Sequence, residues 1–180
     1  MDKQIDNSVA SLTIHEGWNL LSLVSIKSFL NMSIEEIIKS SDNYVSIAAY
    51  YDGAWRQNKE LDFINPAVAY WVYSRDKHVI DLSENDEEDD VTIADIVHTN
   101  NHNEWIYWPI LSTISVEDLY KKVNSVADIK VSYMWHYNAI STSWELNVDG
   151  DLIDIDSFAT FSQVNAGDAV VFKIIKKDNK

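Results

Sequence analysis

Hydrophobic and polar positions alternate along this chain in short runs, and each run predicts one element. Apolar segments rich in β-branched and aromatic residues, at 17–25 and 104–112, are typical of β-strands. The segments at 33–38 and 115–120 instead begin with Ser-x-x-acid and space their apolar residues as one helical face. They predict two short helices with capping boxes. Strands outnumber helices in this pattern, so we expect an α+β fold dominated by β-structure.

Two further kinds of segment predict strands that pair. Residues 49–55 contain Asp52-Gly53, a dipeptide that favours a tight hairpin turn, and residues 135–144 carry a longer turn at the matching place. Residues 64–73 and 164–173 each place a Pro or Gly turn before an apolar closing strand. The expected order is therefore strand, helix, hairpin and closing strand, twice.

The four segments recur in the same order in both halves of the chain, which indicates an internal repeat. Trp18 matches Trp105 in the first segment, and Asn65 matches Asn165 in the last. Chance could produce one such match, but it is a poor explanation for four matches in the same order. We therefore expect two homologous β-rich units, each with one short helix, related by a pseudo-twofold axis.

The division of the chain follows from this repeat. We expect unit one at 11–82, an acidic linker at 83–90 and unit two at 91–177, because the run SENDEEDD cannot bury apolar surface. Units of this size rarely stand alone. We therefore expect the two to pack into one body along an aromatic-rich seam.

The first half also resembles a known family. GWNLL at Gly17–Leu21, Tyr51-Asp52-Gly53 followed by Trp55, and AYWV at Ala69–Val72 resemble the GWNL…GYWV repeat. Such repeats occur in bacterial cell-surface and secreted multidomain proteins, often beside adhesion or sugar-binding modules. The family is not known as an enzyme, so the resemblance implies a non-catalytic role and an outer-surface location.

The second half departs from the family's pattern. Glu104 stands where the motif has glycine, and Ile106 stands where the first half has Asn19. We therefore expect the halves to share a scaffold rather than a site, with any functional surface on one half or at their junction.

Charge and composition restrict the partners. The net charge of −15 repels nucleic acid, so we expect no nucleic-acid partner, and it favours a basic or cation-rich one. The chain has no cysteine, and its apolar runs are shorter than the roughly 18 residues that span a bilayer, so we expect no membrane insertion. The polar first ten residues lack the apolar core of a signal peptide. With the leading Met, this favours a virion protein over a secreted one.

Aromatic residues are the main candidates for recognition. Successive residues of a strand face opposite ways, so Trp71 and Tyr73 share one face while Tyr70 and Val72 share the other. Two apolar faces mean either burial on both sides or an exposed patch that binds a glycan or a protein, and both interpretations stay open. The candidate contacts are Tyr51, Trp55, Tyr73, Trp108, Trp135 and Trp144.

One acidic segment resembles a calcium loop. In ELNVDGDLIDID, residues 145–156, the candidate oxygen ligands are Glu145, Asn147, Asp149 and Asp156. The alternative is a hairpin turn at Asp149-Gly150 with outward-facing acids. We expect no other cofactor.

The leading hypothesis is a non-catalytic structural or interaction module at an outer surface. It fits a virion accessory or decoration protein, or a cell-surface protein, bound to a protein or glycan within a larger assembly. A carbohydrate-binding module is the second hypothesis and an unrecognised hydrolase the third, with the cytoplasm as the alternative location. No nucleophile elbow, P-loop or dinucleotide fingerprint occurs in the sequence, so we expect no enzyme.

Overall fold

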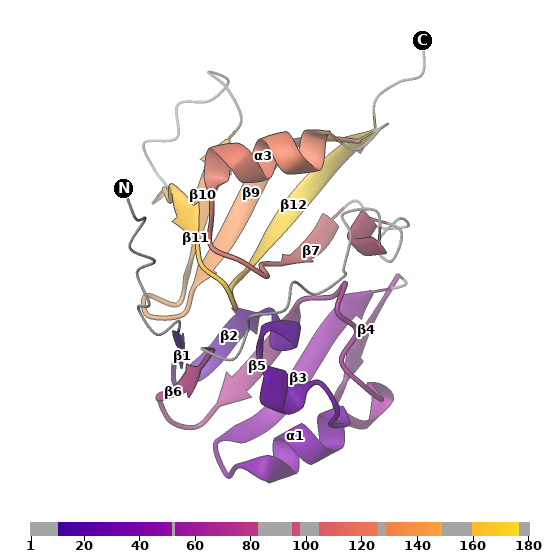
Figure 1. Cartoon of the computed structure of the whole chain (residues 1–180), viewed down its shortest axis with the longest axis vertical. Helices are drawn as coiled ribbons and strands as arrows, with labels where there is room; N and C mark the ends of the chain where they lie inside the picture. The colour runs from indigo at the N-terminus through magenta and orange to yellow at the C-terminus, as the bar shows by residue number, and fades with distance from the viewer. Residues whose placement is uncertain are drawn as a thin grey trace, which may run out of the picture.

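The computed structural model describes residues 11–51, 53–82, 95–97, 105–125, 129–148 and 160–176. These residues form a β-dominated fold with few helices and several antiparallel sheets, as the sequence pattern predicts. Figure 1 shows two larger sheets, one above the other, with helix α1 near one end of the molecule and helix α3 near the other.

The first sheet has the strand order β2-β5-β3-β4. The hairpin β3–β4 turns at Gly53, whose φ of +75° suits the tight turn expected there. The closing strand β5 lies between β2 and β3, so it is paired along both edges. The bounds are β2 Gly17–Leu21, α1 Ile34–Ser40, β3 Tyr44–Tyr51, β4 Ala54–Gln57 and β5 Tyr70–Ser74.

The second sheet has the strand order β10-β9-β12-β7. Read from the other edge, the order is β7-β12-β9-β10. In both sheets, the strand that precedes the helix pairs with the closing strand, and the closing strand pairs with the first strand of the hairpin. The hairpin turn lies between Asn138 and Ser143, as predicted. The bounds are β7 Trp105–Pro109, α3 Val116–Asn124, β9 Ile129–Asn138, β10 Ser143–Val148 and β12 Ala169–Lys176.

Both helices begin at the predicted serines. The Ser33 hydroxyl accepts from the Glu36 N–H at 3.2 Å, and the Glu36 carboxylate accepts from the Ser33 N–H at 2.7 Å, which completes a capping box. Ser115 accepts from the Asp118 N–H at 3.1 Å, but the Asp118 carboxylate accepts from the Ser115 hydroxyl, at 2.8 Å, so this helix has the serine cap without the second bond of the predicted capping box. Each cap satisfies a backbone donor that the first helical turn leaves without a partner.

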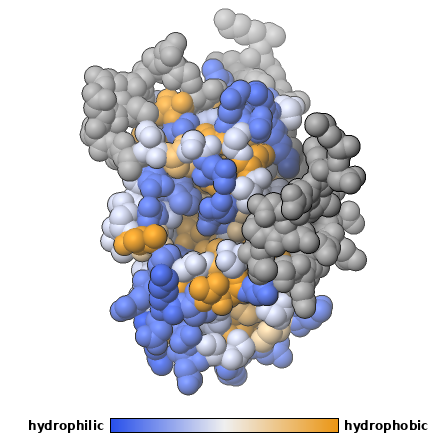
Figure 2. Space-filling model, turned by 60° about the vertical axis from the view of Figure 1, so that its left-hand side comes forward, coloured by the Kyte–Doolittle hydropathy of each residue, from blue (hydrophilic) through white to orange (hydrophobic). Residues whose placement is uncertain are grey.

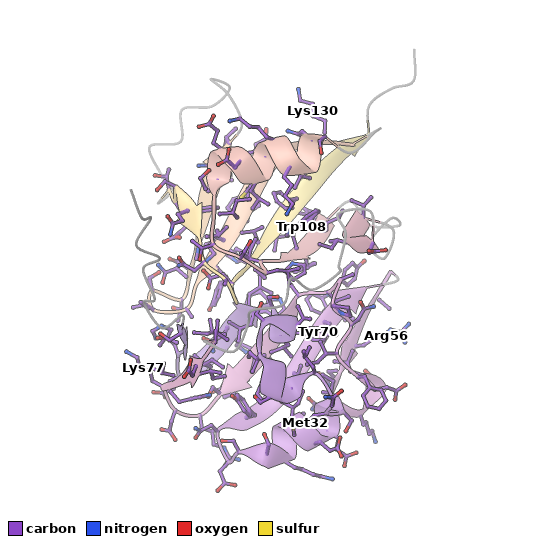
Figure 3. The ribbon with its side chains drawn as sticks, in the orientation of Figure 1. Met32, Arg56, Tyr70, Lys77, Trp108 and Lys130 are labelled. Atoms are coloured by element: carbon purple, nitrogen blue, oxygen red, sulfur yellow. The ribbon has the colours of Figure 1, made fainter. Side chains whose placement is uncertain are left out.

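Each helix covers one face of its sheet and buries an apolar core. Tyr70 and Val72 of β5 face the core under α1, and Trp108 and Phe172 face the core under α3. Figure 3 shows Tyr70 and Trp108 within the molecule, whereas Lys130 extends from one end.

Some boundaries differ from the sequence prediction. The strand expected over 17–25 ends at Leu21, and a 3₁₀ turn, Leu23–Ser25, follows it. An additional pair, β1 Ser11–Ile14 with β6 His78–Asp81, joins the two ends of the first half. The short pair β8 Ile114–Ser115 with β11 Gln163–Val164 adds a second small sheet in the second half. The predicted linker at 83–90 lies outside the described residues.

Asn19 of the GWNLL segment has a structural role. Its Nδ2 donates to the carbonyl of His15 at 2.8 Å, and its Oδ1 accepts from the His15 N–H at 2.9 Å. These bonds hold the turn between β1 and β2, where Gly17 adopts a φ of +92°. The motif residues at this end of the strand therefore build the fold.

Candidate aromatic binding surface

The two sheets meet through the faces that their helices leave uncovered. Leu20, Ala69, Ala169 and Val171 are buried at the centre of this contact, which we call the seam. Backbone bonds reinforce it: the Ser22 N–H donates to the Gly167 carbonyl at 2.8 Å. The seam residues are small or aliphatic, so the larger aromatic residues around them border open space.

A first pocket lies beside the seam on the first sheet. Its volume is about 360 Å³. Strand alternation places its residues on the seam side, because Trp18 pairs with Tyr73 across β2 and β5, and Ala48 pairs with Trp71 across β3 and β5. The lining residues are Trp18, Ala48, Trp55, Trp71 and Tyr137.

A second pocket lies beside the seam on the second sheet. Its volume is about 330 Å³. Trp144 of β10 pairs with Tyr137 of β9, and Trp135 of β9 pairs with Val171 of β12, so all four face the seam side. The lining residues are Trp105, Tyr107, Trp135, Trp144 and Val171.

Ring contacts across the seam connect the two pockets. The Trp71 ring, in the first pocket, lies 5.8 Å from the Trp144 ring in the second, with planes 82° apart. The Trp55 ring, also in the first pocket, lies 5.7 Å from the Tyr107 ring in the second, at 72°. Edge-to-face pairs of this kind add roughly 0.5–1.5 kcal/mol each beyond the burial of area. They hold the walls of both pockets in place.

Four tryptophans of this surface remain accessible to solvent. Trp55 is 54% exposed, Trp18 40%, and Trp105 and Trp144 38% each. Exposed indoles gathered in one group are typical of surfaces that bind a partner. Figure 2 shows that, on one face of the molecule, hydrophobic residues lie in separate patches bordered by hydrophilic ones.

The electrostatics of the second pocket are set by rings and one lysine. The Lys173 Nζ lies 5.7 Å from the centre of the Trp105 ring, a cation–π distance. Burial, and to a lesser extent Tyr50, raises the pKa of the Tyr107 phenol. Tyr107 therefore stays uncharged at neutral pH.

The predicted aromatic contacts divide into separate groups in the structure. Trp55, Trp135 and Trp144 line the pockets. Tyr73 lies outside both linings and packs on Trp18 at 5.2 Å. The side chain of Tyr51 lies outside the described part of the structure.

Trp108 requires a correction. It is 4% exposed and lies in the core under α3, with its ring 5.7 Å from that of Phe172. The alternation of β7 explains this, because Trp105 and Tyr107 face the seam and Trp108 faces the helix. The sequence prediction did not place Trp18, Trp71, Trp105, Tyr107 and Tyr137 among the candidate contacts, although alternation already puts Trp105 and Tyr107 on one face of their strand.

The predicted calcium ligands are only partly described. Asp149 and Asp156 lie outside the described residues. Both carboxylate oxygens of Glu145 already take part in hydrogen bonds, with His136 and Asn138, at 2.9 and 2.8 Å. The Asn147 side chain donates to the Phe161 carbonyl at 3.0 Å. Within the described ranges, no group of three or more His, Asp or Glu side chains could hold a metal ion.

Glu145 and His136 belong to a partly buried polar cluster with Asp168. The His136 Nε2 lies 3.9 Å from the Asp168 carboxylate, which accepts the Asn165 N–H at 3.0 Å. Burial raises the pKa of Asp168. Burial also opposes ionisation of Glu145, but the hydrogen bonds from Asn138 and His136 outweigh it and lower that pKa. The cluster ties the β9–β10 hairpin to the turn before β12.

Comparison with protein-family models, with curated proteins and with solved structures finds no match to this chain. In the described residues, every helix is too short or too polar to cross a membrane.

Proposed function

We propose that this protein is a non-catalytic binding module whose ligand occupies the aromatic pockets at the seam. The observation that carries the proposal is the position of four exposed tryptophans around two apolar pockets. Burying such rings on a partner releases ordered water and supplies large contact area at low entropic cost.

The chain is, in this proposal, a duplication of one unit of the GWNL…GYWV type. The order β2-β5-β3-β4 and the order β7-β12-β9-β10 connect corresponding elements in the same way, which supports a common origin and a pseudo-twofold relation. Trp18 on β2 and Trp105 on β7 then occupy matching places. Duplication accounts for two pockets rather than one.

The two halves also differ in which strand carries the large residue and which carries the small one at a matching cross-strand pair. Ala48 faces Trp71 across β3 and β5, whereas Trp135 faces Val171 across β9 and β12. The large and the small residue have exchanged strands, and each pocket keeps three indoles, one phenol and one small aliphatic side chain. Both pockets are therefore proposed to bind, with affinities that differ.

The pocket linings support some ligands better than others. Sugars need several hydrogen-bonding groups around a flat ring, and the lining side chains offer only indole N–H and phenol groups for this purpose. An apolar or cationic group fits these linings better than a glycan does. A location at the outer surface of a bacterium or a virus particle, within a larger assembly, follows from the family resemblance and is part of the same proposal.

A fragment screen by NMR tests binding while the ligand is still unidentified. The indole N–H signals are assigned with single Trp→Phe variants, and a library of small neutral and charged fragments is added to the full chain. We expect hits that shift the indole signals of Trp18, Trp55 and Trp71, or of Trp105, Trp135 and Trp144. Hits that all leave these six signals unmoved would reject the proposal.

A further inference from the structure

We propose that both pockets are aromatic cages for a methylated ammonium group, that is, a cation covered by methyl groups. The inference deepens the proposed function and rests on it. It names the ligand class: choline-like headgroups, betaines or methylated lysine side chains share this chemistry.

The ring content of each pocket is the first support. Three indoles and one phenol line each volume. The π face of such a ring carries negative potential, which attracts a cation. In the second pocket the planes of Trp135 and Trp144 are 86° apart. In the first pocket the planes of Trp18 and Trp71 are 88° apart. Perpendicular rings can wall adjacent sides of one volume, which is how a cage surrounds a rounded group.

The charge of the protein is the second support. A net charge of −15 draws cations toward the surface, while the residues that line the pockets are uncharged. Lys173 already places its ammonium 5.7 Å from the Trp105 ring, so one ring of the second pocket has a cation beside it. The Trp105 ring thus has a cation partner within this chain.

The lining side chains offer few hydrogen-bond acceptors, and this favours some cations over others. A bare ammonium is strongly hydrated, and the lining side chains, apart from one phenol oxygen in each pocket, offer no acceptor to replace its water. Methyl groups remove that need and add apolar contact with the indoles. A methylated ammonium group therefore suits these pockets better than free lysine.

The two pockets should differ in affinity because of Lys173. Its charge lies beside the second pocket, while Tyr73, packed on Trp18, takes the corresponding place beside the first. Like charges repel, so the second pocket should bind a cation more weakly. Lys173→Met should strengthen cation binding there severalfold and leave the first pocket unchanged.

The test compares choline with its neutral isostere, 3,3-dimethylbutan-1-ol, on the full chain at constant ionic strength. Indole N–H shifts report occupancy of each pocket. We expect the cation to bind about tenfold or more tightly than the isostere. Trp55→Ala should abolish binding to the first pocket and Trp105→Ala binding to the second, whereas Phe63→Ala, at an exposed residue in neither lining, should change neither.

Each outcome is decisive. Equal or tighter binding of the neutral isostere would overturn the cation cage and leave the proposed binding module standing. If neither probe moves the indole signals but other fragments do, the cage is again rejected and the module survives. If no probe or fragment moves them, both proposals fail. Circular dichroism of each variant confirms that lost binding does not reflect unfolding.

Discussion

The Trp71 ring packs edge-to-face against the Trp144 ring, with centroids 5.8 Å apart, and so links the closing strand of the first sheet to the hairpin of the second. Trp71 also contacts Trp18 at 6.4 Å and Tyr137 at 4.8 Å. One indole thus touches rings from both sheets. It is the side chain whose removal should affect the seam most.

Trp71→Ala should lower the free energy of unfolding by about 2–4 kcal/mol, because it removes a half-buried indole and three ring contacts. Urea denaturation followed by far-UV circular dichroism measures the loss. Trp55→Ala is the control, since Trp55 is 54% exposed and should cost less. Equal losses in the two variants would show that Trp71 has no special role in the seam.

Gly167→Ala should also destabilise the protein, by about 1–2 kcal/mol, for two reasons. Gly167 has a φ of +91°, and an added Cβ would lie 3.0 Å from the Leu12 side chain. Gly53→Ala is the matched control, because Gly53 has a φ of +75° with nothing within 4 Å of the added Cβ. The excess cost at Gly167 should shrink when Leu12→Ala is combined with it. An unchanged excess would mean that Leu12 is not its cause.

Local interactions account for the elements that the sequence predicted correctly. The caps at Ser33 and Ser115 involve residues three positions apart, so the residues that form them are close together in the sequence. The turn at Gly53 is equally local. The pairing of β1 with β6 instead joins Ser11 to Asp81, and no short-range signal marks it.

The site was harder to predict because it depends on which face of each strand meets which neighbour. Alternation separates Trp108 from Trp105 and Tyr107, but it does not say which side the helix will cover. Trp71 and Trp144 meet only because two sheets pack together. That contact is non-local. The pattern of residue types along the chain could therefore identify the aromatic residues but not their grouping into pockets.

Asp168→Asn should raise stability at neutral pH. Burial raises the pKa of Asp168 above its ordinary value of 3.8, so the folded chain holds this proton more firmly than the unfolded chain does. The stabilisation from protonation is complete below pH 3.8 and is lost as pH rises through the folded pKa. The stability of the asparagine variant relative to the wild type should therefore increase as pH rises. Urea denaturation between about pH 4 and about pH 8 measures the difference.

Glu145→Gln should have the opposite effect on stability at neutral pH. Burial opposes ionisation of Glu145, but the bonds from Asn138 and His136 outweigh it and hold its pKa below 4.5. The stability that the ionised carboxylate contributes is present above pH 4.5 and is lost as pH falls through the folded pKa. The glutamine variant should be less stable than the wild type at neutral pH, and the deficit should shrink in acid. Parallel pH profiles for Asp168→Asn and Glu145→Gln would contradict one of the two assignments, and the sign of the shared slope would show which.

The exchange of large and small residues between the halves predicts a coupling that can be measured. Ala48 and Trp71 are direct cross-strand neighbours, whose Cβ atoms in such pairs lie about 4.5–5.5 Å apart. Ala48→Trp alone should crowd the seam face, and Trp71→Val alone should leave a gap, each costing roughly 1–3 kcal/mol. Together they recreate the arrangement of Trp135 and Val171 on the second sheet.

A double-mutant cycle tests this coupling. We expect the combined variant to be at least about 1 kcal/mol more stable than the sum of the single effects, because the new indole fills the space that Trp71 vacates. The control pair is Ala48→Trp with Phe63→Ala. Phe63 lies outside the pocket linings, so the effects of these two substitutions on stability should be additive. Additive losses in the Ala48 and Trp71 cycle would mean that the two sheets do not offer equivalent environments at these positions. The compensated exchange would then be a coincidence of sequence rather than a trace of duplication.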